Sequence, residues 1–260
     1  MEILRKTIKS GNASAVVLPK SWLDKNVRIE LIDKTPEMML REVLEIIAKH
    51  MDLSEVIGVY LTGSYAREDD SVNSDIDILV ITEKTSREII KKENYEILIV
   101  SLDLLTYKLR ENLFPVGVML KEAKSLLNKN FLESVRITVT KKNIKWYLDA
   151  TKERLKLIKN SIDLIEKKKP NGKLSDAIAY SLVLRLRTLY IIDCLNKNKP
   201  YKKIEFVKLI KEVSGSSTAY ERYIYAKCHS DNKRELLLIE GKNLYNYLKD
   251  YLQKIIGSVN

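Results

Sequence analysis

The sequence predicts an α+β protein built from a small N-terminal β-hairpin unit, a central mixed-sheet domain and a C-terminal all-α helical bundle. Three observations support this prediction. The first residues alternate apolar and polar side chains, the middle holds short β-rich runs, and the remainder carries apolar side chains at helical spacing. We place the three domains at residues 1–34, 35–135 and 136–260.

The N-terminal unit is predicted from short strands. Glu2–Leu4, Val16–Leu18 and Val27–Leu31 are rich in β-branched or alternating side chains, and Ser10-Gly11-Asn12 predicts a turn. A segment this short buries little apolar surface by itself.

The central domain begins with a helix. Thr35-Pro36-Glu37 offers an N-cap, a proline at the first helical position and an early acid, and the helical spacing continues to about His50. Three β-rich runs are predicted as strands: Val56–Leu61, Ile76–Ile81 and Tyr95–Val100. A short helix is predicted at residues 85–92, between the second and third of these strands.

The pattern turns helical from about Val116. Pro170-Asn171-Gly172, Lys199-Pro200 and Ser214-Gly215-Ser216 break it into pieces, which predicts a bundle. The expected helices are Lys141–Glu166, Leu174–Asn196, Lys202–Val213, Thr218–Lys227 and Lys233–Ile256.

The composition is that of a folded protein, because 45% of the 260 residues are hydrophobic. The longest apolar run, Leu113–Leu120, is too short to cross a membrane, and the N-terminus lacks the apolar core of a signal peptide. Two cysteines make no disulfide framework. We therefore expect a soluble, cytoplasmic protein with no membrane partner.

The charge is unevenly distributed. Residues 1–40 hold 7 basic and 5 acidic side chains, residues 41–140 hold 13 and 17, and residues 141–260 hold 26 and 13. The corresponding net charges are +2, −4 and +13. An acidic middle beside a basic C-terminal half favours a cation site next to a surface for nucleic acid; a solvated lysine-rich surface is the other interpretation.

The most informative residues are the carboxylates of Asp75-x-Asp77. On a strand the period of two puts both on one face and turns Ile76 to the other. Two adjacent acids repel each other unless a cation neutralises them, and oxygen ligands favour Mg²⁺ or Mn²⁺. A third acid on a neighbouring strand completes a two-ion site, and Glu96 is the candidate.

A phosphate-binding turn is predicted just upstream. Gly63-Ser64 follows a strand and offers close backbone approach, N–H groups and a hydroxyl. The stretches Leu61-Thr62-Gly63-Ser64-Tyr65-Ala66-Arg67 and Ser74-Asp75-Ile76-Asp77-Ile78 together resemble the nucleotidyltransferase domain of the polymerase β superfamily. They are most similar to the minimal nucleotidyltransferases with their GSYARG…SDIDI motif.

This resemblance implies roles for individual residues. Asp75 and Asp77 would bind both metal ions, and Glu96 would bind one ion and help to activate the attacking hydroxyl. The triphosphate of ATP or another NTP would be held by Gly63 and Ser64, with Arg67 as an extra contact.

Two residues depart from the family pattern. Glu68 follows Arg67 where the family usually has glycine, and Glu96 stands where aspartate is commoner.

The implied reaction is in-line attack of an acceptor hydroxyl on the α-phosphorus, with pyrophosphate as the leaving group.

The segment from Lys6 to Leu23 resembles the swapped-hairpin units of AbrB and MazE type antitoxins and regulators, through its Lys9-Ser10-Gly11-Asn12 turn and its Ala-Val-Val-Leu-Pro strand. The resemblance implies a homodimer and a DNA-binding surface. The DNA-binding candidates are Lys6, Lys9, Asn12 and Lys20.

The C-terminal helices resemble the helical domains of the kanamycin nucleotidyltransferase and HEPN groups. HEPN ribonucleases carry an arginine followed a few residues later by histidine. Here Arg185-Leu186-Arg187 is followed by Asp193 and no histidine, so we predict no nuclease activity.

The sequence thus predicts a Mg²⁺-dependent nucleotidyltransferase that moves a nucleoside monophosphate, AMP from ATP first of all, onto an acceptor hydroxyl. The acceptor stays open among RNA such as a tRNA end, a protein tyrosine and a small aminoglycoside-like compound. The alternative is a dimeric DNA-binding regulator or antitoxin with an inactive transferase core, and a third hypothesis is an assembly module.

Overall fold

A computed structural model describes the chain and confirms the α+β fold class. Residues 1–35 and 36–260 form two separate compact units. The residues outside the description are Met1, Lys6, Leu31, Asp33, 71–73, 229–234 and Asn260, together with the side chains of Lys227 and Cys228.

The N-terminal unit contains one small antiparallel hairpin, β1 (Ile8–Ser10) and β2 (Ala13–Ala15), followed by the short 3-10 helix η1 (Lys20–Trp22). Gly11 lies in the turn with a φ of 60°, a conformation that glycine adopts without strain. The predicted strands at 2–4, 16–18 and 27–31 are wrong for the residues described, since none of them pairs with another strand of this chain.

The second unit begins with α1 (Pro36–Ile47), which starts at the predicted proline, and continues through η2 (Leu53–Glu55) into a five-stranded mixed sheet. The strand order is β5-β6-β4-β3-β7; β4 and β6 are parallel and the other pairs are antiparallel. The strands are β3 (Val56–Thr62), β4 (Ile76–Thr82), β5 (Arg87–Lys92), β6 (Tyr95–Ser101) and β7 (Lys124–Leu127). The three central strands were predicted from their β-rich composition.

Two edge strands differ from the prediction. The helix expected over residues 85–92 is wrong, because Arg87–Lys92 forms β5 and pairs antiparallel with β6 across a tight turn at Glu93, whose φ is 55°. The helical pattern expected from Val116 onwards is wrong at Lys124–Leu127, which forms β7 beside β3. Both segments are short and largely exposed, so pairing with a neighbouring strand overrides a weak local pattern.

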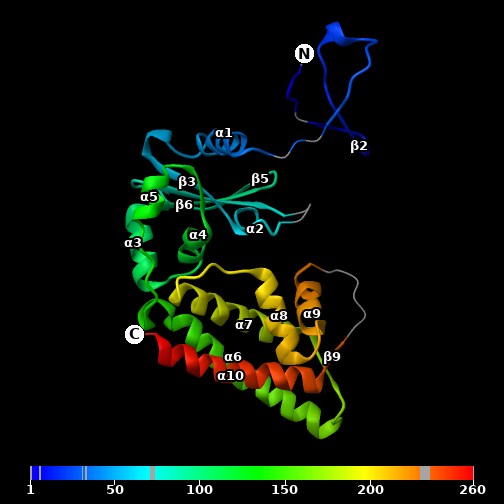
Figure 1. Cartoon of the computed structure of the whole chain (residues 1–260), viewed down its shortest axis with the longest axis vertical. Helices are drawn as coiled ribbons and strands as arrows, with labels where there is room; N and C mark the ends of the chain where they lie inside the picture. Colours follow the sequence, from blue (N-terminus) through cyan, green and yellow to red (C-terminus); the bar gives the residue numbers. More distant parts are fainter. Residues whose placement is uncertain are drawn as a thin grey trace. The chain divides into compact units, whose positions relative to one another are not determined.

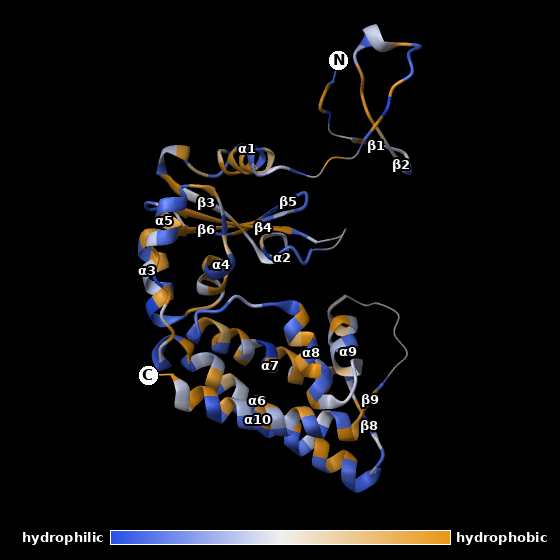
Figure 2. Ribbon diagram, in the orientation of Figure 1, coloured by the Kyte–Doolittle hydropathy of each residue, from blue (hydrophilic) through white to orange (hydrophobic). Residues whose placement is uncertain are grey.

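The two faces of the sheet are covered by different helices (Figure 1). On one face α1 packs through Met39, Val43 and Ile47. The other face packs against α3 (Leu102–Glu111) and α4 (Val116–Glu122). The central strands are hydrophobic along most of their length (Figure 2), as expected for a sheet buried on both sides.

The helical part consists of α6 (Lys141–Lys168), α7 (Asp176–Asn196), α8 (Lys203–Ser214), α9 (Thr218–Cys228) and α10 (Leu238–Ser258). The helix α7 packs against α6, α8, α9 and α10, which is why its sequence is apolar nearly all round. Small pieces complete the fold: α2 (Gly63–Arg67), α5 (Lys129–Ser134), and the strand pair β8 (Lys173–Leu174) and β9 (Leu236–Leu237).

The predicted helices of this part agree with the observed ones except at two starts. Leu174 lies in β8, and α7 begins at Asp176. Of the last predicted helix, Lys233 and Arg234 lie outside the described residues, and α10 begins at Leu238 after the strand β9. Thr140 and Asn143 form a reciprocal capping box that fixes the start of α6. Among the residues described, no helix has the length and apolarity needed to span a bilayer.

Candidate active site

The predicted acids lie where three strands meet at one end of the sheet. β3 ends at Thr62, and β4 and β6 begin near Asp77 and Glu96. Thr62 is the register partner of Asp77, and Asp77 is the register partner of Glu96. Residues opposite each other on adjacent strands point to the same face. The topology therefore puts Thr62, Asp77 and Glu96 in one row.

This row lies on the sheet face that is covered by α3 and α4. Ile76 and Ile78, which flank Asp77, are buried in the core beneath α1. Leu79, the next residue on the same face as Asp77, is buried against the α3 and α4 side. The predicted alternation of Asp77 with Ile76 and Ile78 is therefore the one the structure has, whereas Asp75 precedes β4, which begins at Ile76.

The carboxylates repel one another. Asp75 is exposed, whereas Asp77 and Glu96 are half-buried. Burial raises the pKa of the Asp77 carboxyl, and the charges of Glu96, Glu122 and Asp75 raise this pKa further. A bound cation would remove that repulsion.

The donor set fits Mg²⁺ or Mn²⁺, since all three predicted ligands are carboxylates and Asp77 sits among like charges. Their side chains do not yet converge: within the described ranges, no three His, Cys, Asp or Glu side chains lie close enough to hold an ion. Glu96 instead forms an ion pair with Lys91, its cross-strand neighbour on β5.

The Gly63-Ser64 turn opens α2 directly after β3. Gly63 has a φ of +67°, and a Cβ placed there would lie 1.9 Å from Asp77 Oδ2. Only glycine lets the turn come this close to the carboxylate. The half-buried Ser64 follows it in the chain.

The structure adds an acid that the sequence did not single out. Glu122, the last residue of α4, accepts a hydrogen bond from the Gly63 N–H at 2.8 Å, and Arg67 binds its other oxygen at 2.6 Å. Burial raises the pKa of Glu122, and Arg67 opposes that shift. No local motif marks Glu122, because packing of α4 against the sheet brings it to the site.

Arg67 is engaged by two carboxylates. In addition to Glu122 it contacts Asp69, with Nε 3.3 Å from Oδ2 and a terminal nitrogen 3.2 Å from Oδ1. The second contact is an ion pair without hydrogen-bond alignment, since the buried Oδ1 has no hydrogen-bond partner.

Residues of the helical part reach the same place. The guanidinium groups of Arg67 and Arg187 lie 5.6 Å and 5.3 Å from the centre of the Tyr201 ring. Arg187 also donates a hydrogen bond from Nε to the Tyr201 hydroxyl at 3.3 Å. The helix α7 therefore contributes the Arg187 cation near Glu122. Its positive charge partly opposes the rise in the Glu122 pKa that burial causes.

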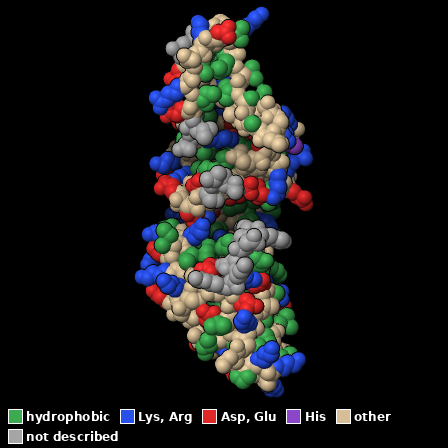
Figure 3. Space-filling view, turned by 90° about the vertical axis from the view of Figure 1, so that its right-hand side faces the viewer, with side chains coloured by type: hydrophobic (Ala, Val, Ile, Leu, Met, Phe, Trp, Pro, Cys, Tyr) green, Lys and Arg blue, Asp and Glu red, His purple; other side chains and the backbone are tan. Residues whose placement is uncertain are grey.

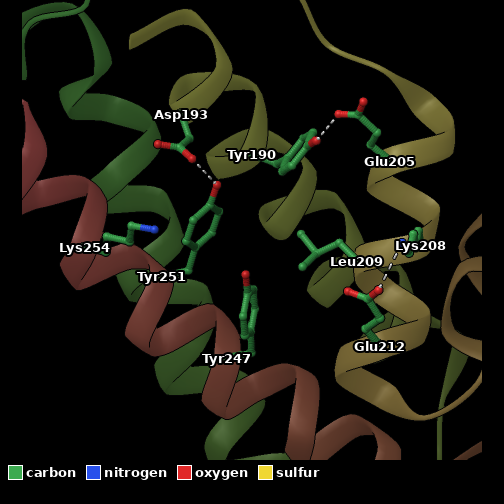
Figure 4. A pocket seen from close by; sticks show the side chains of 9 residues that line it. All are labelled: Tyr190, Asp193, Glu205, Lys208, Leu209, Glu212, Tyr247, Tyr251 and Lys254. Carbon is green, nitrogen blue, oxygen red and sulfur yellow. Dashed lines mark hydrogen bonds and ion pairs between the residues drawn. The ribbon is translucent and has the colours of Figure 1, made fainter. Parts of the chain in front are cut away.

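A separate pocket of about 320 Å³ lies between α7, α8 and α10 (Figure 4). Asp193 accepts a hydrogen bond from Tyr251 at 2.9 Å there, and Tyr190 donates one to Glu205 at 3.4 Å. The pocket contains none of the predicted site residues.

The predicted DNA-binding residues Lys9, Asn12 and Lys20 are exposed in the N-terminal unit. Lys6 lies outside the described residues. On the face drawn in Figure 3, Lys and Arg side chains of the helical part occur at several separate places among acidic ones.

Comparison with known proteins bears on this arrangement. A family model described as "Nucleotidyltransferase domain" matches residues 40–214, about two thirds of the chain. A search of curated protein sequences gave no significant match. Among solved structures, the chain is similar to a spectinomycin adenyltransferase from Enterococcus faecialis, crystallised with ATP and spectinomycin. The TM-score is 0.42 and the identity 16%, over 82% of this chain and 98% of that one.

The family match spans the Gly63-Ser64 turn and all three predicted acids. The chain belongs to the nucleotidyltransferase domain family.

Proposed function

We propose that this protein is a Mg²⁺- or Mn²⁺-dependent nucleotidyltransferase that transfers a nucleoside monophosphate, AMP from ATP in the simplest case, onto an acceptor hydroxyl. The observation that carries the proposal is the register of Thr62, Asp77 and Glu96 at the end of three adjacent strands, directly beside the Gly63-Ser64 turn. This register supports a site in which the acids bind ions beside a turn that contacts phosphate.

The chain's own residues have distinct tasks in this reaction. Asp75, Asp77 and Glu96 would hold two ions, which supply charge neutralisation on the triphosphate and a lowered pKa of the attacking hydroxyl. The turn at Gly63 and Ser64 would bind the triphosphate through Ser64, since the Gly63 N–H already donates to Glu122. Glu96 would hold an ion only after giving up its ion pair with Lys91, and that pair is open to solvent because the Lys91 side chain is 70% exposed on the edge strand β5.

The acceptor we propose is RNA. The net charge of +13 over residues 141–260 supports an acceptor rich in phosphate, since Lys and Arg bind it with release of counterions. A protein hydroxyl is the competing acceptor, and salt dependence separates the two. Transfer to RNA should fall steeply between 50 and 200 mM salt, whereas transfer to a protein should change little.

Label transfer from each of four α-³²P-labelled NTPs tests this proposal, with total tRNA, the protein itself and a cell lysate as acceptors. Label should appear on one acceptor with one NTP, and EDTA or Asp75→Ala/Asp77→Ala should abolish it. Absence of label from every combination with folded protein contradicts the proposal.

We also propose that the N-terminal unit makes the protein a homodimer. In the described part of residues 1–35 no side chain is buried, and large apolar side chains such as Val17, Leu23 and Ile29 are 61%, 72% and 65% exposed. A second copy of the unit would cover them. Light scattering should give twice the chain mass for the wild type and the chain mass for Leu23→Ser/Ile29→Ser.

The dimeric regulator is retained as the second candidate function, because Lys9 and Lys20 are exposed on this unit. Gel shifts on the protein's own promoter test it. Binding that persists in Asp75→Ala and is lost in Lys9→Ala/Lys20→Ala would support DNA binding; no shift at low salt would rule it out.

A further inference from the structure

Glu122 connects the two ends of α2. One carboxylate oxygen accepts from the N–H of Gly63, the first residue of the helix, at 2.8 Å. The other oxygen lies 2.6 Å from the guanidinium of Arg67, the last residue. The Glu122 side chain is only 9% exposed, so water competes weakly for these contacts.

The helix needs such a connection. α2 has five residues, and an isolated helix of one turn is unstable because its few hydrogen bonds do not offset the cost of nucleation. A carboxylate at its N-terminal N–H is also favourable for the helix dipole.

The position of α2 controls the candidate active site. Gly63 lies against Asp77 so closely that an added Cβ would overlap the carboxylate. A small displacement of α2 would therefore change the separation between the phosphate-binding turn and the metal-binding acid.

Arg67 has little charge left for a phosphate. It is paired with Glu122 and with Asp69, and its side chain is 17% exposed. It also lies over the Tyr201 ring from the helical part. These contacts hold the guanidinium on the side of α2 that faces Glu122.

We propose that Glu122 is a positioning residue that clamps both ends of α2, and that Arg67 acts through Glu122 rather than by contacting the triphosphate. The inference rests on the proposed nucleotidyl transfer. Because the Gly63 N–H is bound to Glu122, it leaves Ser64 as the residue of the turn that contacts phosphate. It keeps Gly63 as the residue whose missing Cβ allows the close approach to Asp77, and it assigns Arg67 to the support of that turn.

Kinetics of Glu122→Gln, Arg67→Met and the double variant test the proposal. The clamp predicts that each single change lowers kcat for label transfer roughly 10- to 100-fold with little change in KM for the NTP, because misplacement of reacting groups slows the chemical step. The kcat of the double variant should be no lower than that of the slower single variant, because both changes remove the same interaction between Glu122 and Arg67.

A direct contact between Arg67 and the triphosphate predicts the opposite pattern. Glu122→Gln would then free a cation and lower the KM for the NTP, and Arg67→Met would raise it in both backgrounds. Either result, or fully multiplicative losses in the double variant, overturns the clamp.

Glu68→Gln is the matched control. It removes an exposed ion pair with Lys124 one residue beyond α2, where the Glu68 side chain is 80% exposed. It should leave kcat and KM within about twofold of the wild type.

Amide hydrogen exchange keeps the test independent of activity. Glu122→Gln should speed exchange in peptides covering residues 63–67 and leave those from β4 and β6 unchanged. Absence of transfer in the wild type would contradict the proposed function, and exchange would then decide the clamp alone. Unchanged exchange at residues 63–67 overturns it.

Discussion

The two faces of the central sheet differ in what their side chains do. Beneath α1 the face is apolar through its middle and carries no charged side chain where it is buried, although Thr82 and Ser101 are buried at its far end. The α1 side chains Val43 and Ile47 that pack on it are fully excluded from solvent. The opposite face is equally apolar in its middle, at Leu79 and Ile81, but its end holds Asp77, Glu96 and the buried Glu122. One face serves stability alone, and the other combines a core with a charged site.

The comparison shows that like-charged side chains lie close together at the end of one face of the sheet. Asp77 is half-buried among three other carboxylates, an arrangement that destabilises the protein without a cation. Such costs concentrate at functional sites. Substitutions on the two faces should therefore separate activity from stability.

Asp77→Asn should have the largest effect. Nucleotidyl transfer should fall about 1,000-fold or more, because Asp77 is the ligand proposed to be shared by both ions. The thermal midpoint should stay the same or rise, because the change removes a repelled charge. The exposed Asp103→Asn on α3 is the control and should keep full transfer. Equal transfer by Asp77→Asn and Asp103→Asn would contradict an active site on this face of the sheet.

Ile47→Ala tests the α1 face. The side chain is fully buried, so the free energy of unfolding in urea should fall by about 2–5 kcal/mol, while transfer per folded molecule stays unchanged. Leu79→Ala, the matched change on the opposite face, should cost similar stability and also reduce transfer. Equal effects on transfer would erase the distinction between the faces.

Gly63→Ala should lower transfer roughly 10- to 100-fold, since a Cβ would lie 1.9 Å from Asp77 Oδ2 and one of the two groups must move. Gly11→Ala serves as the comparison, because Gly11 has a similar φ of +60° with no atom within 4 Å of its added Cβ. Steady-state kinetics should show the loss for Gly63→Ala and none for Gly11→Ala, which lies in the other unit; unchanged transfer by Gly63→Ala would contradict the crowding at Asp77.

Tyr60→Phe should have the smallest effect. Its hydroxyl donates to the Asn128 carbonyl oxygen at 3.1 Å, so the loss should be about 0.5–1.5 kcal/mol. Burial raises the pKa of Tyr60 to about 12, so its contribution is present below pH 10 and is lost as the pH rises towards 12. The stability difference from wild type should therefore shrink between pH 10 and 12, and a constant difference would contradict this assignment.

The sequence predicted the parts of the site that depend on local pattern. The strands β3, β4 and β6 are β-rich, and the spacing of Gly63-Ser64 and Asp75-x-Asp77 identified the turn and the acids. The mutual register of Asp77 and Glu96 could not be read from the sequence, because a slip of one residue would have reversed it.

The remaining parts depend on tertiary contacts. β5 and β7 are exposed edge strands whose pairing overrides their local preference. Glu122 and Arg187 reach the site because α4 and α7 pack beside it, and neither belongs to a motif of fixed spacing. The second carboxylate partner of Arg67, Asp69, was equally outside any pattern.

Binding of a non-hydrolysable NTP measured by calorimetry, with and without Mg²⁺, is the most direct test of the site, because it requires no acceptor. The wild type should bind in a Mg²⁺-dependent manner, and Asp75→Ala/Asp77→Ala should lose that dependence while remaining folded. Equal affinity of the two proteins in Mg²⁺, or no binding by the wild type, would contradict a nucleotide site at the end of β3, β4 and β6.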